Sequence, residues 1–122
     1  RMTAIDLSTG EHLWMKPMGN GDRIRNLPML RDLNLPPLGG DSSRAGPLLT
    51  KNLLIYALTT GGTNDRPRLV ALDKMTGNEV ASVDLPGGAI GTPMTYMLDG
   101  KQYIALTVGG GRVPELIALS LP

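Results

Sequence analysis

One motif occurs twice in this chain, and such a repeat restricts the possible architectures more than any other sequence feature. Residues 3–14 read TAIDLSTGEHLW, and residues 70–81 read VALDKMTGNEVA. The two copies align without a gap, 67 residues apart, with the same Ala, Asp, Thr and Gly at equivalent places. The chain therefore contains one structural unit at least twice.

Each copy is typical of a β-hairpin. An apolar run at 4–7 or 69–72 precedes Asp-x-x-Thr-Gly, and a second strand follows at 11–15 or 78–83. In such turns the Asp carboxylate accepts backbone N–H groups, and Gly adopts a positive φ. We therefore expect Asp6 and Asp73 to cap turns at 8–10 and 75–77.

A second repeat alternates with the first. Residues 46–50 and 53–62 are similar to residues 92–96 and 102–110. The order is strand pair, hairpin, strand pair, hairpin, and residues 115–121 then repeat the opening strand of the hairpin motif. Four short antiparallel strands in every 40 to 50 residues or so is the period of a β-propeller blade.

The predicted fold is all-β: a partial β-propeller with about two and a half four-stranded antiparallel blades. Residues 1–19 would end one blade, 46–86 would form the next, and 87–122 would form a last, partial blade. Residues 20–45 contain several prolines and are expected to form a long irregular loop, and no helix longer than two turns is expected. Because propeller blades bury their faces on one another, we expect the chain to be a segment of a longer protein.

Composition excludes several functions. Twelve basic and eleven acidic residues are mixed along the chain, and only four residues are aromatic, so we expect no nucleic-acid partner. The sequence has no Cys, which excludes disulfides and thiolate metal sites within it. No apolar run approaches the roughly 20 residues that span a bilayer.

The repeated residues carry a family resemblance. Ala4-x-Asp6-x-x-Thr9-Gly10-x-x-x-Trp14 resembles the tryptophan-docking motif of the quinoprotein dehydrogenases, eight-bladed propellers that use pyrroloquinoline quinone (PQQ). In that family the Trp packs between neighbouring blades. We therefore expect Trp14 to be buried against the strand pair that contains Ile55 or against an adjoining blade. The second copy has Ala81 in place of this Trp.

The second half extends the resemblance. TPMTY at 92–96, DGKQYI at 99–104, the Gly run at 109–111 and LIALSLP at 116–122 resemble the carboxyl-terminal end of the membrane-type glucose and alcohol dehydrogenase branch. The resemblance covers residues 2–122 and is weakest across 20–44.

The resemblance implies an enzyme that oxidises a sugar or alcohol by hydride transfer to PQQ, with Ca²⁺ at the quinone. Electrons would pass to a quinone or a cytochrome, and the protein would be periplasmic or membrane-associated and face the periplasm. The family's catalytic Asp and calcium ligands belong to blades outside this chain. We therefore assign no catalytic or metal-binding residue here, and expect the isolated segment to be inactive and to depend on the remaining blades.

Two loops carry the candidate cofactor-binding residues that the resemblance implies. Asp65 matches a cofactor-proximal Asp, and Arg66, like Arg44, has the guanidinium that pairs with a carboxylate. Gly110 and Gly111 belong to the last Gly run, where the family branch has a His at position 111. The alternative is that Asp65 and Arg66 are solvated loop charges and that the glycines only permit a tight turn.

A second class of function fits the same fold. Non-catalytic PQQ-like β-propellers serve as scaffolds for protein interaction, and they carry the same hairpin motif without a cofactor. The residues at 92–96 and 100–103 resemble the enzymes more than the scaffold. The sequence does not indicate the substrate.

Overall fold

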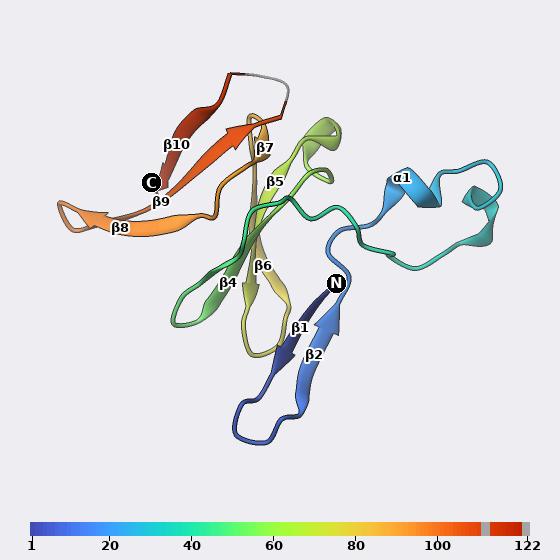
Figure 1. Ribbon diagram of the computed structural model, residues 1–122, viewed down its shortest axis with the longest axis horizontal. Helices are drawn as coiled ribbons and strands as arrows, with labels where there is room; N and C mark the ends of the chain where they lie inside the picture. Colours follow the sequence, from blue (N-terminus) through green and yellow to red (C-terminus); the bar gives the residue numbers. More distant parts are fainter. Residues whose placement is uncertain (111–112, 121–122) are drawn as a thin grey trace.

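The computed structural model describes residues 1–110 and 113–120, which form three antiparallel sheets (Figure 1). The first sheet is the hairpin of β1 (Met2–Ile5) and β2 (His12–Lys16). The central sheet has the order β3 (Leu48–Leu49), β4 (Leu53–Leu58), β5 (Arg68–Asp73), β6 (Glu79–Asp84). In the last sheet, β9 (Lys101–Gly109) pairs with β10 (Glu115–Ser120) on one side and with β7 (Gly88–Ala89) and β8 (Met94–Leu98) on the other.

This arrangement confirms the prediction of an all-β, partial β-propeller. The first hairpin contributes two strands, the central sheet has four, and the last sheet has three strand positions because β7 and β8 share one side of β9. The strands of the three sheets lie at residues 2–16, 48–84 and 88–120.

The two repeated hairpins have the same register. Ala4 lies opposite Trp14 in the first, and Ala71 lies opposite Ala81 in the second, with an irregularity directly after Ala4 and after Ala71. The second strands begin and end one residue later than the motif predicted, at His12–Lys16 and Glu79–Asp84. The repeat in the sequence is thus a repeat in the backbone.

The turns of both hairpins are capped as expected. Asp6 Oδ1 accepts the Ser8 N–H at 2.8 Å, and Asp73 Oδ1 accepts the Thr76 N–H at 2.8 Å. These hydrogen bonds, together with those from the Ser8 and Thr76 hydroxyls, hold the pKa of both carboxyls below the ordinary value. The motif Asp and Gly residues are therefore explained by the turn alone.

The central sheet carries an apolar cluster on each face, as alternation along its strands requires. One face packs against the last sheet, through Ile55, Ala57, Leu69, Leu106 and Val108. The other face packs against the first hairpin, through Tyr56, Leu58, Val70 and Leu72 with Met2 and Trp14 beside them.

Trp14 connects the first hairpin to the turn of the second. Its Nε1–H donates to the Lys74 carbonyl at 2.9 Å, and a Cβ added at Gly77 would lie 2.7 Å from the indole. The ring packs against the central sheet, as the family resemblance led us to expect. It lies, however, on the face opposite Ile55, and it is only partly buried.

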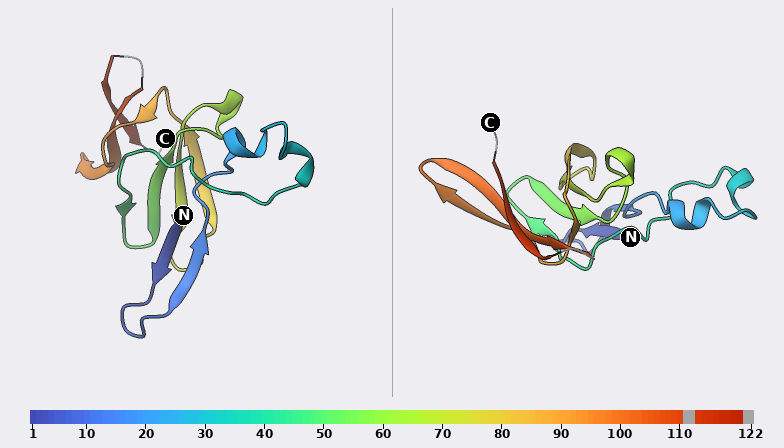
Figure 2. Two further views of the ribbon diagram at one scale, coloured as in Figure 1. Left: turned by 45° about the vertical axis from the view of Figure 1, so that its right-hand side comes forward. Right: turned by 90° about the horizontal axis from the view of Figure 1, so that it is seen from above.

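The long loop between β2 and β3 has more structure than its prolines suggest. It contains the single-turn α1 (Asp22–Arg25) and the 3-10 turn η1 (Arg31–Leu33), and it extends away from the three sheets (Figure 2). Buried Asp41 accepts the Gly21 N–H at 2.6 Å and, through its carbonyl, the Thr59 N–H at 2.7 Å. Among the described residues, no helix is long and apolar enough to cross a membrane.

Candidate functional site

The two loops with the candidate residues lie at the same end of neighbouring sheets (Figure 1). One loop joins β4 to β5, and the other follows β9. The segment between β6 and β7 contacts both of them. Its Leu85 N–H donates to the Pro67 carbonyl at 2.8 Å, and a Cβ at Gly87 would lie 2.7 Å from the Gly109 carbonyl oxygen.

Asp65 lies in the 3-10 turn η2 (Thr63–Asp65), with a positive φ of 59°. Its carboxylate Oδ1 accepts the Gly61 N–H at 3.1 Å, so the side chain closes its own loop. The residue is exposed. Asp65 therefore shapes the loop that carries Arg66.

Arg66 follows η2 in an extended backbone conformation and is also exposed. Its carbonyl accepts the Gly62 N–H at 2.8 Å, so its backbone belongs to the closure of the loop. A guanidinium in this setting fits a carboxylate ligand.

Asp84 is a further residue of this region that the sequence analysis did not select. Its carboxylate accepts the Thr63 N–H at 3.1 Å, and the hydrogen bonds from Thr63, with the nearby charges of Arg66 and Arg68, lower its pKa. The sequence signal for it is an acidic residue at a strand end, directly before Leu-Pro-Gly-Gly. Asp84 fixes the loop that carries Asp65 and Arg66 to the end of β6.

Gly110 directly follows β9, with a φ of 92° that favours Gly. Gly111 lies outside the described residues. Arg44 is exposed in the segment before β3, next to Ser43, whose N–H donates to the Ala57 carbonyl at 3.1 Å. The structure thus places Asp65 and Arg66 on one loop and Gly110 on another, at the same end of two adjoining sheets.

The family resemblance implies two bound groups, PQQ and Ca²⁺, and the described residues fit them to different extents. The guanidinium of Arg66 has the donor groups that suit a carboxylate, such as those of PQQ. Within residues 1–110 and 113–120, no three His, Cys, Asp or Glu side chains are grouped so that they could hold a metal ion. Calcium needs several oxygen ligands, so these residues alone do not form a Ca²⁺ site.

Comparison with known families agrees with this architecture. The PQQ family, described as the glucose/ethanol/alcohol dehydrogenase β-propeller domain, matches residues 1–104. The chain belongs to this family. This match confirms the family that the hairpin motif suggested for this quinoprotein segment.

Several named proteins are similar to this quinoprotein segment. The glycerol dehydrogenase large subunit of Gluconobacter thailandicus is 36% identical over 110 residues, which cover 89% of this chain and 14% of that protein. The quinoprotein glucose dehydrogenase of Escherichia coli (strain K12) is 34% identical over 113 residues, which cover 89% and 13%.

A solved structure is similar as well. The quinohemoprotein alcohol dehydrogenase from Comamonas testosteroni aligns at 34% identity with a TM-score of 0.45, over 52% of this chain and 9% of that one. The quinoprotein segment thus spans only a small part of the relatives that it matches.

Proposed function

We propose that this chain is part of a PQQ-dependent dehydrogenase that oxidises a sugar or polyol and passes the electrons to a quinone or a cytochrome. The match of residues 1–104 to the dehydrogenase propeller family supports this proposal. The 36% and 34% identities to a glycerol and a glucose dehydrogenase support the substrate class. From the family resemblance of the sequence we also propose that the parent protein is periplasmic or membrane-associated and faces the periplasm, and that this segment depends on its remaining blades.

The role of this segment is to bind and orient the cofactor. Arg66 would pair with a PQQ carboxylate, and the Asp65 and Asp84 hydrogen bonds would hold the loop of Arg66 in place. PQQ, when bound, supplies the acceptor for the hydride of the alcohol. The Ca²⁺ ligands would come from other blades, because the described residues do not supply them.

The experiment is a PQQ titration of the full-length parent protein, with binding measured by equilibrium dialysis and oxidation of glucose and glycerol measured with a dye acceptor. Arg66→Gln should weaken PQQ binding by about tenfold or more, because it removes a charged hydrogen bond. Arg31→Gln is the matched control, since Arg31 is an exposed arginine on the long loop.

Asp65→Ala tests the same loop through a different contact. Loss of the acceptor for the Gly61 N–H should weaken PQQ binding by about tenfold in the same assay. Unchanged titrations for both variants, in folded protein, would make Asp65 and Arg66 solvated surface charges. A folded parent protein that neither binds PQQ nor oxidises either substrate would favour the scaffold function.

A further inference from the structure

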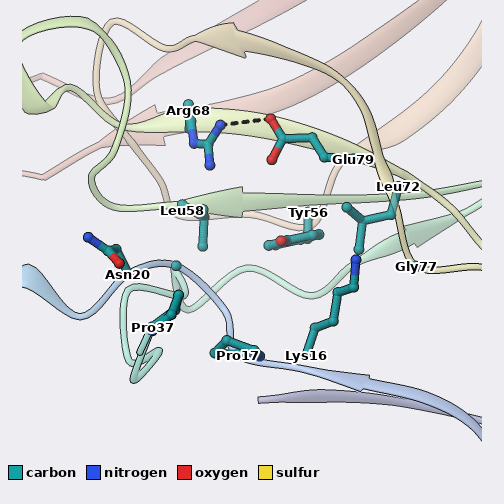
Figure 3. A pocket seen from close by; sticks show the side chains of 11 residues that line it. Lys16, Pro17, Asn20, Pro37, Tyr56, Leu58, Arg68, Leu72, Gly77 and Glu79 are labelled. Carbon is teal, nitrogen blue, oxygen red and sulfur yellow. Dashed lines mark hydrogen bonds and ion pairs between the residues drawn. The ribbon is translucent and has the colours of Figure 1, made fainter. Parts of the chain in front are cut away.

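A pocket lies between the first hairpin, the long loop and the central sheet (Figure 3). Its volume is about 290 Å³, at the lower end of the size of small-molecule sites, which is about 300 Å³. The residues that matter for its chemistry are Lys16, Pro37, Tyr56, Leu58, Arg68 and Glu79. They come from β2, the long loop and three strands of the central sheet.

The floor of the pocket is apolar, and the cationic side chain of Arg68 lies beside it. Strand register places Leu58 opposite Arg68 and Tyr56 opposite Val70, so these side chains share one face of the sheet. Tyr56 and Leu58 are buried there. In Figure 3 they extend from β4 toward Pro37 and Pro17 across the pocket.

The Arg68 guanidinium has hydrogen-bonding capacity left over. Its side chain is 23% exposed, and its Nη1–H donates to Glu79 Oε1 at 2.8 Å. Its Nε is buried and has no hydrogen-bond partner among the described residues. Arg68 lines the pocket and is partly exposed, so an acceptor that enters the pocket can pair with its guanidinium.

The charges of the pocket favour an anion. Arg68 and Lys16 are cationic and Glu79 is anionic, which leaves one net positive charge. Lys16 Nζ lies 3.3 Å from Asn78 Oδ1, at the far side from the Arg68 end of the pocket. Burial and the charge of Glu79 raise the pKa of Tyr56, against the opposing effect of Arg68, so its hydroxyl remains a donor at neutral pH.

We propose that this pocket binds a small organic monocarboxylate. Its carboxylate pairs with the guanidinium of Arg68, as planar forks of this kind do, and its apolar body lies against Tyr56 and Leu58. Glu79 competes with the ligand for Arg68, because both are carboxylates on the same guanidinium. This site is additional to the cofactor loops and does not depend on PQQ binding.

The test uses benzoate as the probe and its neutral counterpart benzamide, with binding to the full-length parent protein measured by isothermal titration calorimetry. Benzoate should bind and benzamide should not. Arg68→Gln should weaken benzoate binding by about tenfold or more, because a charged hydrogen bond is lost. Glu79→Gln should strengthen it severalfold, because the competing carboxylate is removed. Arg31→Gln, on the exposed loop, should leave it unchanged.

Opposite effects of the Arg68 and Glu79 substitutions are the signature of a ligand that replaces Glu79. If the Arg68–Glu79 ion pair were purely structural, both substitutions would change benzoate affinity in the same direction. Absence of benzoate binding, equal binding of benzamide, or weaker binding in Glu79→Gln would each overturn the proposal. If Arg68→Gln prevents folding, the Glu79→Gln variant alone still tests whether the ligand carboxylate replaces Glu79 on Arg68.

Discussion

Trp14 and Ala81 occupy equivalent positions in the two hairpins, yet only one of them fills the space between sheets. The Trp14 indole rests on Gly77 and donates to Lys74. Beside Ala81 there is instead a largely apolar cavity of about 400 Å³, lined in part by Leu69, Ile104 and Leu119. The residue at this one position, Trp14 or Ala81, thus distinguishes the packing beside the first hairpin from the packing beside the second.

Trp14→Ala is expected to lower the free energy of unfolding of the parent protein by about 3 kcal/mol, because removal of an indole leaves a cavity between the hairpin and the central sheet. Trp14→Phe should cost about 1 kcal/mol less than that, since packing is partly retained while the Lys74 hydrogen bond is lost. Urea unfolding measures both. A loss below about 1 kcal/mol for Trp14→Ala would contradict a packing role.

The two turn aspartates give a pH dependence with a defined sign. The pKa of Asp73 in the folded protein lies below 3.8, its ordinary value, so the unfolded chain binds protons first as the pH falls. The stability that this carboxylate contributes is present above pH 3.8 and is lost as the pH falls through the folded pKa.

Asp73→Asn should therefore make the acid side of the stability curve shallower, in thermal unfolding measured from about pH 2 to 6. Asp32→Asn serves as the control, because Asp32 is exposed on the long loop, away from both turns. Identical curves for the wild type and Asp73→Asn would show that the turn carboxylate does not couple to folding.

At the scale of elements, local signals in the sequence predicted the hairpins well. Asp-x-x-Thr-Gly specifies both a turn and its cap, so the second strands of both hairpins were correct to within one residue, whereas the first strand of the first hairpin lies two residues earlier than its apolar run at 4–7. The order of the sheets followed from the alternating repeats. The hairpins depend on residues that are close together in the chain, and a single sequence is enough to reveal such local patterns.

The contacts that hold the loops were not predictable in the same way. Asp41 bonds to Gly21, and Asp84 bonds to Thr63, each about twenty residues distant along the chain. Neither pair forms a recognisable motif. The Arg68 pocket likewise depends on strand register and on the path of the long loop, so the sequence alone did not indicate it.

Asp84→Ala is expected to loosen the loop between β4 and β5, because the Thr63 N–H loses its acceptor. Amide hydrogen exchange at Thr63 should become faster in the parent protein, while exchange in β9 should not change. Asp99→Ala, at the exposed turn between β8 and β9, is the matched control. Unaltered exchange at Thr63 would show that Asp84 does not restrain this loop.

At the scale of the whole molecule, the three sheets are parts of one larger assembly. Propeller blades bury their faces on neighbouring blades, and the relatives are several times longer than this chain. The family was predictable from the hairpin motif and the second repeat. The substrate was not predictable from the sequence.

The segment of residues 1–122 alone should show no PQQ-dependent oxidation of glucose or glycerol, because residues 1–110 and 113–120 do not group into a Ca²⁺ site. The full-length parent protein, assayed with the same dye acceptor, should be active. Sustained turnover by the segment alone would contradict the view that catalytic groups lie in other blades.

The hydrogen bond from Trp14 has a further consequence for which substitutions the chain tolerates. Its acceptor is the main-chain carbonyl of Lys74, so the indole does not recognise the side chain at that position. Position 74 needs a residue that keeps its N–H, which donates to the Asn52 carbonyl at 3.0 Å, and this excludes proline. Gly77 has no such freedom, because a positive φ and the overlying ring both exclude a side chain. At this interface the side chain can therefore change at position 74, whose carbonyl accepts the hydrogen bond, whereas position 77 must stay Gly.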